Sequence, residues 1–196
     1  MNVKKNIAET VKIVLPLFLI CTLMVFLIAI CNAVTSPVIE RNKQKTFDRS
    51  IATLFSIAST EKLKVEKLSF PSNAPATLIS AHRIYNEDLP IGYLMEVDGI
   101  GAYSGKIRML VALDCSGRII DLLCSEQSET PGKGDRVLNA QFYSEHYIGK
   151  SSQEISVSPY PALSGSTKTS DALYSAVNTA LEGYALLSND ATGGPS

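Results

Sequence analysis

Residues 106–123 read KIRMLVALDCSGRIIDLL and predict a β-hairpin, the element around which the rest of the fold is arranged. The two apolar runs, Lys106–Ala112 and Arg118–Leu123, have strand character, and Asp114-Cys115-Ser116-Gly117 between them is a turn sequence. With Cys115 opposite Arg118, the register places Cys124 opposite Met109. The two cysteines are then about 20 Å apart along the ladder, too far for a disulfide, so we expect both to be free.

Further elements are expected on both sides of this hairpin. Strands are expected at Ile79–Tyr85 and Ile91–Val97, followed by a glycine-rich loop at Gly99–Gly105. Helices are expected at Asn139–Tyr147 and Asp171–Gly183, with Gly183 as the C-cap of the second. Consecutive strands with helices at both ends favour an α+β fold with an antiparallel sheet over an alternating βαβ arrangement.

An uninterrupted apolar run, IVLPLFLICTLMVFLIAIC, extends from Ile13 to Cys31. As a helix it is roughly 28 Å long, close to the ~30 Å hydrocarbon core of a bilayer. The alternative is a cleaved signal peptide, but signal h-regions are shorter, about 7–15 residues. We expect an uncleaved single anchor in the lipid bilayer. Lysines and arginines lie on both sides of the run, so the flanking charges do not decide its orientation.

The chain is therefore divided by sequence into five parts. These are a short N-terminal segment (1–12), a transmembrane helix (13–34), a stalk helix and linker (35–70), a folded domain (71–190) and a tail (191–196). The stalk is expected to be helical because apolar residues recur at helical spacing between residues 47 and 57.

Composition excludes several classes of function. Lys and Arg total 18 and Asp and Glu total 19, giving a net charge of −1, which argues against nucleic-acid binding. The two histidines are far apart in sequence and lack metal-ligand spacing, so no metal site is expected. No Ser-His-Asp set is recognisable either, so independent catalysis by side chains is not expected.

Two loops carry candidate binding residues. The first, SGSTKTS at Ser164–Ser170, precedes the last expected helix, where free backbone N–H groups and the helix dipole favour an anion and Lys168 adds positive charge. The alternative is simple N-capping by Thr169 or Ser170. The second loop, ETPGKGD at Glu129–Asp135, contains a Pro-Gly turn and by itself is an ordinary loop.

Taken in order, the anchor, the glycine loop, the hairpin, the ETPG loop and the SGxTxTS loop resemble a known family. The chain is similar to the FMN-binding G subunit of Rnf-type electron-transport complexes, and to its relative, the C subunit of the sodium-translocating NADH:quinone oxidoreductase. The resemblance implies an electron-transfer subunit with neighbouring membrane subunits as partners, in a bacterial or archaeal inner membrane with its domain extracytoplasmic.

The resemblance also implies the cofactor and its site. In that family FMN is joined through its phosphate to the last residue of a D-x-x-[ST]-G-A-T motif by a flavin transferase. Carried over, this makes Thr167 the attachment residue, with Ser164, Gly165, Ser166, Lys168 and Thr169 around it and Glu129, Thr130 and Gly132 near the flavin. Pro161 replaces the motif's Asp, and Ser166 its Ala. Tyr103 is expected to be a structural tyrosine, and Lys133 replaces the family's usual Leu.

Two other functions stay open from the residues. A flavin-free extracytoplasmic binding or assembly domain is favoured by Pro161, and an extracytosolic flavin reductase with a soluble acceptor is the third possibility. Flavin fluorescence that survives denaturation in SDS separates the flavin-carrying functions from the flavin-free one.

Overall fold

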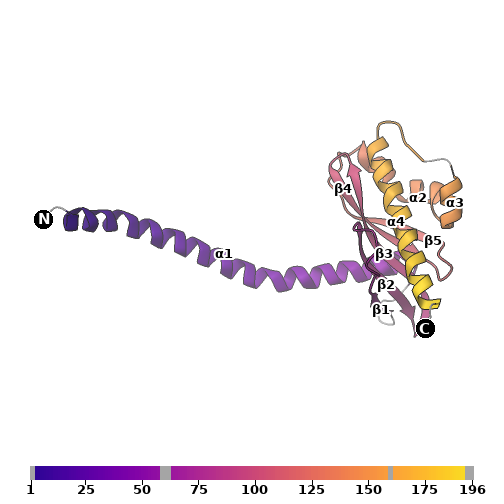
Figure 1. The fold of residues 1–196 in the computed structure, drawn as a ribbon, viewed down its shortest axis with the longest axis horizontal. Helices are drawn as coiled ribbons and strands as arrows, with labels where there is room; N and C mark the ends of the chain where they lie inside the picture. The colour runs from indigo at the N-terminus through magenta and orange to yellow at the C-terminus, as the bar shows by residue number, and fades with distance from the viewer. Residues whose placement is uncertain (1–2, 58–62, 159–160, 193–196) are drawn as a thin grey trace. The chain divides into compact units, whose positions relative to one another are not determined.

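A computed structural model describes residues 3–57, 63–158 and 161–192, which form two compact units, residues 1–48 and 49–196. The second unit is built on a five-stranded antiparallel sheet with strands in sequential order (Figure 1). The strands are β1 (Leu63–Leu68), β2 (Leu78–Asn86), β3 (Leu89–Ala102), β4 (Gly105–Leu113) and β5 (Ile119–Glu126). The expected α+β class with an antiparallel sheet is confirmed.

The predicted hairpin is β4 and β5. The Asp114 carboxylate closes its turn by accepting hydrogen bonds from the backbone N–H groups of Ser116 (2.8 Å) and Arg118 (2.9 Å). Met109 pairs with Cys124, which is the register expected from the turn. All four cysteines are free.

The glycine-rich stretch before β4 is mostly strand, which corrects the expected loop. β3 continues to Ala102 and β4 starts at Gly105, so only Tyr103 and Ser104 form the turn. Gly101, with φ of 92°, lies at a register shift between Ile100 and Ala102. Gly101 therefore permits a bulge in the strand, and Gly99 permits the close approach of Ala172, whose carbonyl oxygen would lie 2.3 Å from a Cβ at Gly99.

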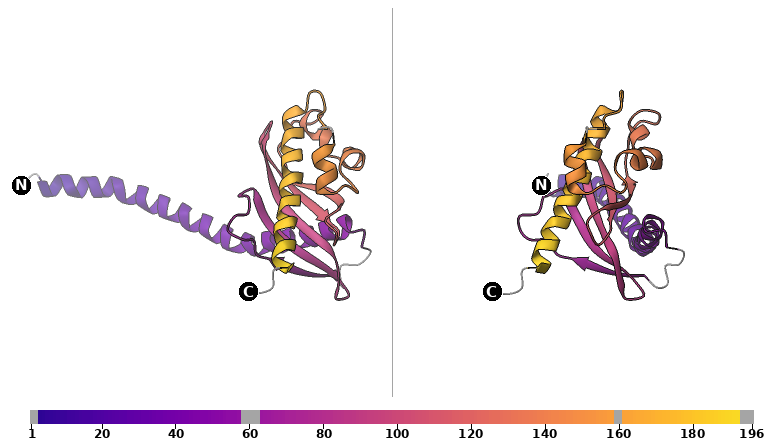
Figure 2. Two further views of the ribbon diagram at one scale, coloured as in Figure 1. Left: turned by 45° about the vertical axis from the view of Figure 1, so that its right-hand side comes forward. Right: turned by 90° about the vertical axis from the view of Figure 1, so that its right-hand side faces the viewer.

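The long helix α4 (Thr167–Thr192) packs along β3 on one face of the sheet (Figure 2). Leu173, Val177, Ala180 and Leu181 are all buried, as the sequence periodicity predicted. The helix is longer than expected at both ends, and Gly183 is not its C-cap. Gly183 lies inside the helix, at a position where a Cβ would come within 2.7 Å of the Leu78 side chain. The glycine therefore allows α4 to pack closely on Leu78.

Shorter helices complete the layer on the α4 side. They are η2 (Gly134–Val137), α2 (Ala140–His146) and α3 (Ser152–Val157). The Asn139 side chain caps α2, as expected for a helix in this stretch, whereas α3, which was not predicted, begins with a Ser151–Glu154 capping box. Phe142, Tyr143 and Ile155 join the main core with the inward side chains of the sheet.

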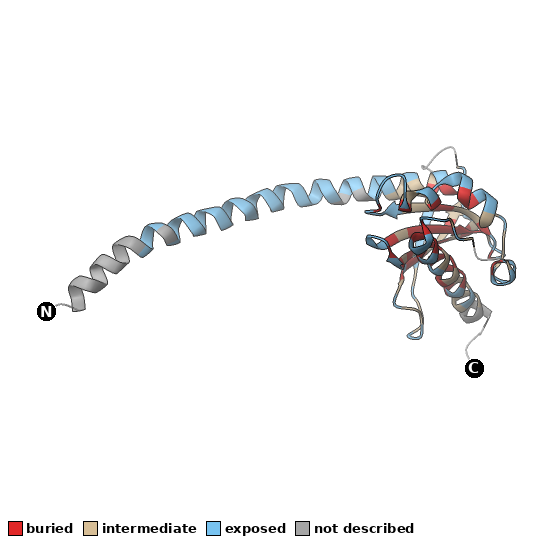
Figure 3. Ribbon diagram, turned by 90° about the horizontal axis from the view of Figure 1, so that it is seen from above, coloured by how far each residue is buried: buried red, intermediate tan, exposed pale blue. Residues whose placement is uncertain are grey.

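The first helix, α1 (Val3–Leu54), contains the apolar run. Its described side chains from Val14 to Ile39 are exposed, and by length and composition the helix is able to cross a membrane (Figure 3). Its last turns belong to the second unit, where Ile51 and Leu54 are fully buried.

The boundaries expected for the stalk need correction. The helix ends at Leu54, and Leu63–Leu68 form the edge strand β1 where a stalk helix and linker had been predicted. The folded unit therefore begins near Arg49 and not near residue 71. The side chains of β1 are mostly exposed, so apolar periodicity did not reveal this strand.

Candidate functional site

A cavity of about 420 Å³ lies where three segments of the second unit meet. Tyr103 contributes from the β3–β4 turn, and residues 165–169 from the start of α4. The third wall is the loop leading into η2 together with η2 itself, with Thr130, Gly132 and Lys133 from the loop and Gly134 and Arg136 from η2. Pockets of about 300–1,000 Å³ are typical of small-molecule and cofactor sites.

The start of α4 is fixed by Ser166. Its carbonyl accepts the first helical hydrogen bond, from the Ser170 backbone N–H at 2.9 Å, which makes Ser166 the N-cap position. The Ser166 hydroxyl does not cap the helix but donates to the Lys133 carbonyl, tying the helix start to the opposite loop. Thr167 is consequently the first helical residue, exposed at the cavity.

This geometry corrects the capping alternative. Thr169 and Ser170 lie within the first turns of α4 and are not its N-cap. The Ser170 hydroxyl donates to the Ser166 carbonyl (3.0 Å) and accepts from the Leu163 backbone N–H (3.3 Å), so it secures the approach to the helix.

Glu129 lies beneath the cavity and joins all three segments. Its side chain is almost fully buried, and one carboxylate oxygen accepts hydrogen bonds from the Ser104 N–H (2.8 Å) and hydroxyl (2.6 Å). The other oxygen accepts from the Thr169 hydroxyl at 2.7 Å. Burial raises the pKa of Glu129, but these hydrogen bonds outweigh it and hold the pKa below its usual value. Glu129 is thus an ionised anchor for the cavity walls.

Gly134 makes room for this carboxylate. A Cβ on Gly134 would lie 1.8 Å from the second carboxylate oxygen of Glu129 and 2.9 Å from the Thr169 hydroxyl. Gly132 is different: its φ is 78° and the space beside it is open, so it permits the turn at the cavity wall.

The cavity is electrostatically positive. Lys133, Arg136 and Lys168 line it with exposed side chains, and none of the described residues that line it is acidic. The start of α4 adds the partial positive charge of a helix N-terminus. Among the described residues, no group of three or more His, Cys, Asp or Glu side chains is placed to hold a metal ion. The positive charge of this cavity favours binding of an anionic organic ligand.

Comparison with known proteins agrees with this chemistry. Residues 102–182 match the family model of the FMN-binding domain. The G subunit of the ion-translocating oxidoreductase complex of Escherichia coli K12 is 33% identical over 81 residues, 39% of each chain. The G subunit of the Na(+)-translocating ferredoxin:NAD(+) oxidoreductase complex of Acetobacterium woodii is 26% identical over 193 residues, 90% of this chain and 92% of that one. The chain is thus similar to G subunits of Rnf-type complexes, along most of its length in the A. woodii protein. Its alignment spans about two fifths of the E. coli protein, and residues 102–182 are an FMN-binding domain.

Within this FMN-binding domain, the structure brings together most of the residues carried over from the family. Thr130, Gly132 and the stretch 165–169 all line the cavity. Glu129 does not line it but supports it from below, and Ser164 is exposed outside it.

For two residues of the cavity, the expectation from sequence was wrong or absent. Tyr103, expected to be structural, is 73% exposed and lines the cavity. Arg136 received no role, although a second cation three residues after Lys133 was the available signal.

Proposed function

We propose that this chain is a membrane-anchored electron carrier of an ion-translocating electron-transport complex, with FMN joined by a phosphoester to Thr167. The observation that carries the proposal is the position of Thr167, at the first turn of α4 on the wall of a cavity with three cations. A phosphodiester keeps one negative charge, which the helix N-terminus and Lys168 stabilise.

The residues present fit FMN. The cavity volume of about 420 Å³ falls in the range of cofactor sites, and its walls combine cations for a phosphate with an exposed tyrosine for a ring. Gly165, with φ of 82° and open space beside it, lets the backbone turn into the helix at the point where a phosphate would approach. Bound flavin supplies the redox chemistry.

The protein's own residues then have holding roles. Thr167 would provide the oxygen of the ester, and Lys168 would offset the charge of the phosphate. Glu129 and Ser166 would hold the β3–β4 turn, the loop before η2 and the start of α4 in place through their hydrogen bonds. None of these roles is proton transfer, in keeping with a carrier that does not act on its own.

The names of the relatives, which are subunits of membrane complexes, support a proposal about location and partners. We propose that the domain lies on the extracytoplasmic side of an inner membrane, held by α1 as a single uncleaved anchor. It would exchange electrons with neighbouring membrane subunits after a flavin transferase has attached FMN. The apolar, exposed side chains of α1 support the anchor.

Intact-mass spectrometry of the full chain tests the attachment. The chain is made in membranes together with a flavin transferase, and we expect an added mass of one FMN less one water. Thr167→Ala should remove both this mass and the fluorescence that survives SDS. Thr167→Ser should retain them, because it keeps a hydroxyl.

Ser164→Ala is the matched control, since Ser164 is exposed outside the cavity and should leave attachment intact. Covalent flavin on the Thr167→Ala chain would show that another hydroxyl carries the ester. A colourless wild-type chain in the presence of the transferase would leave the flavin-free binding domain as the better function.

A further inference from the structure

The cavity carries more positive charge than one phosphodiester requires. Lys133, Arg136 and Lys168 line it, and among the described residues no carboxylate lies within ion-pair distance of any of the three. This occurs in a chain whose formal net charge is −1. By contrast, both cations on the outer face of β4, Lys106 and Arg108, are paired with Asp98 at 2.8–2.9 Å. The cations of the cavity are therefore available to a ligand.

The three cations come from two different walls. Lys168 lies on α4 directly after Thr167, on the side where the phosphate would be attached. Lys133 and Arg136 lie on the opposite segment, around the start of η2, and Tyr103 lines the cavity from the β3–β4 turn. Once Lys168 and the helix N-terminus stabilise the phosphate, two positive charges remain on the wall that the rest of the cofactor would face.

The redox chemistry of flavin gives these charges a role. The oxidised ring is neutral, whereas uptake of two electrons and one proton leaves a reduced ring with one negative charge. Uptake of a second proton makes the reduced ring neutral. Nearby cations stabilise the anionic form and lower its affinity for the second proton.

We propose that Lys133 and Arg136 raise the reduction potential of the bound flavin by stabilising its reduced, anionic form. This proposal rests on the FMN attachment proposed above. The electrons come from a reducing redox subunit and the single proton from water. The two cations raise the reduction potential, so the carrier accepts electrons more readily than a flavin in water.

Two acidic groups near these cations act in the opposite direction. Glu129 lies under the same wall, with its carboxylate held by Ser104 and Thr169. Asp135, between the two cations in sequence, has a buried carboxylate oxygen without a hydrogen-bond partner. Both acidic groups are shared by all variants below, so differences among them report the cations.

The test is a spectroelectrochemical titration of the flavin-loaded full chain with dithionite as reductant. In the double variant K133Q/R136Q, we expect the ratio of reduced to oxidised flavin at a fixed potential to fall about tenfold or more, which is about 30 mV for a two-electron couple. Arg136→Lys should keep most of the wild-type potential, because the charge is retained. Lys150→Gln removes one positive charge outside the cavity and should have no effect.

The dependence of the potential on pH gives a second readout. One proton per two electrons gives a slope of about 30 mV per pH unit, and two protons give about 59 mV. The wild type should keep the shallower slope to lower pH than K133Q/R136Q. If the two side chains had only a structural role, their replacement would not change the pH at which the slope switches from about 59 to about 30 mV per pH unit.

Binding of free flavins to the apo Thr167→Ala chain distinguishes the tuning from phosphate binding. If Lys133 and Arg136 serve the phosphate, their replacement weakens binding of FMN but not of riboflavin and leaves the potential unchanged, which overturns the proposal. Absence of covalent flavin from the wild type overturns the attachment instead. The potential is then measured on FMN bound reversibly to the Thr167→Ala chain, and if that chain binds no FMN, the tuning is overturned as well.

Discussion

The buried carboxylate of Glu129 accepts a hydrogen bond of 2.7 Å from the hydroxyl of Thr169, forty positions later in the chain. Because Thr169 is in the first turns of α4, this bond fixes the helix start against the loop that enters η2. The same carboxylate accepts two hydrogen bonds from Ser104, so one side chain holds three segments together.

Replacing Glu129 should therefore destabilise the domain. Glu129→Gln removes the charge that accepts three hydrogen bonds, and hydrogen bonds to a charged group contribute about 1.5–3 kcal/mol. We expect a loss of about 2 kcal/mol in the free energy of unfolding at pH 7, measured by urea denaturation. Glu126→Gln makes the same change on a side chain that is 66% exposed, and it should cost less than about 1 kcal/mol.

The contribution of Glu129 to the free energy of unfolding should decrease as the pH falls. Its pKa in the folded protein lies below the unfolded value of about 4.3, so the stabilisation is fully present above that value and is lost as the pH falls through the folded pKa. The stability difference between wild type and Glu129→Gln should shrink below about pH 4. A difference that grows on acidification would contradict an ionised Glu129.

A methyl group at Gly134 should disturb the same anchor. Because a Cβ there would lie 1.8 Å from the Glu129 carboxylate, Gly134→Ala forces that side chain or the η2 loop to move. Overpacking of this kind costs about 1–3 kcal/mol. Gly132→Ala is the comparison, because its cost arises only from a positive φ and should be about 1–2 kcal/mol without displacing Glu129. Slower exchange of the Ser104 amide proton in Gly134→Ala than in wild type would contradict this account.

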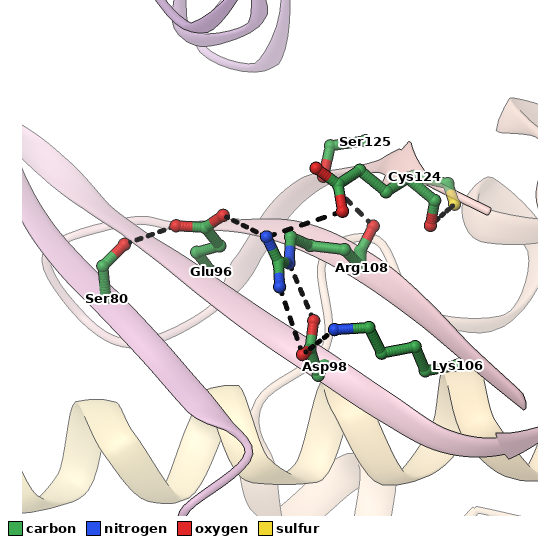
Figure 4. Close-up of polar contacts among 8 residues, drawn as sticks. Ser80, Glu96, Asp98, Lys106, Arg108, Cys124 and Ser125 are labelled. Carbon is green, nitrogen blue, oxygen red and sulfur yellow. Dashed lines mark hydrogen bonds and ion pairs between the residues drawn. The ribbon is translucent and has the colours of Figure 1, made fainter. Parts of the chain in front are cut away.

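A second polar network stabilises the sheet on the face away from α4 (Figure 4). Asp98 on β3 accepts hydrogen bonds from Arg108 (2.8 Å and 3.2 Å) and Lys106 (2.9 Å) on β4. The Arg108 guanidinium is the main cause of the lowered pKa of Asp98. Asp98→Asn should cost about 1–2 kcal/mol near neutral pH, with the difference declining below pH 4. Asp88→Asn, at a side chain that is 88% exposed, should change stability by less than about 0.5 kcal/mol.

The two domain cysteines should react at different rates. Burial raises the pKa of the Cys124 thiol to about 11, whereas Cys115 is exposed on its turn. A pKa two units above the ordinary value leaves about a hundredfold less thiolate, and the thiolate is the reactive form. With iodoacetamide at pH 8, peptide mapping should find Cys115 modified well before Cys124. Equal rates would indicate that β5 opens in solution.

The hairpin shows which parts of the fold are readable from sequence. Asp114 and Gly117 specify the β4–β5 turn through local hydrogen bonds and a positive φ, so the register and the Met109–Cys124 pair followed correctly. The start of α4 was placed too late because its Ser and Thr residues are typical of caps. In the fold they bond to Lys133 and Glu129, which are distant in sequence.

The candidate site was readable only through the family motif. Glu129 has partners 25 and 40 positions away, so its burial as an ionised anchor depends on tertiary contacts that no local pattern encodes. The edge strand β1 was not predicted from the sequence, for a related reason. Its exposure on both faces removes the alternation by which strands are recognised.

Gly99 has no side chain to separate β3 from α4, and a Cβ there would come within 2.3 Å of the Ala172 carbonyl. The sheet and the helix thus meet backbone to backbone, about one and a half helical turns beyond Thr167. Side-chain rotamers cannot relax or reset such a contact, so the helix start has little freedom to drift from the sheet. In an electron carrier, that stiffness would limit variation in the electron-tunnelling distance. It would also keep the reorganisation energy of the protein small on each transfer.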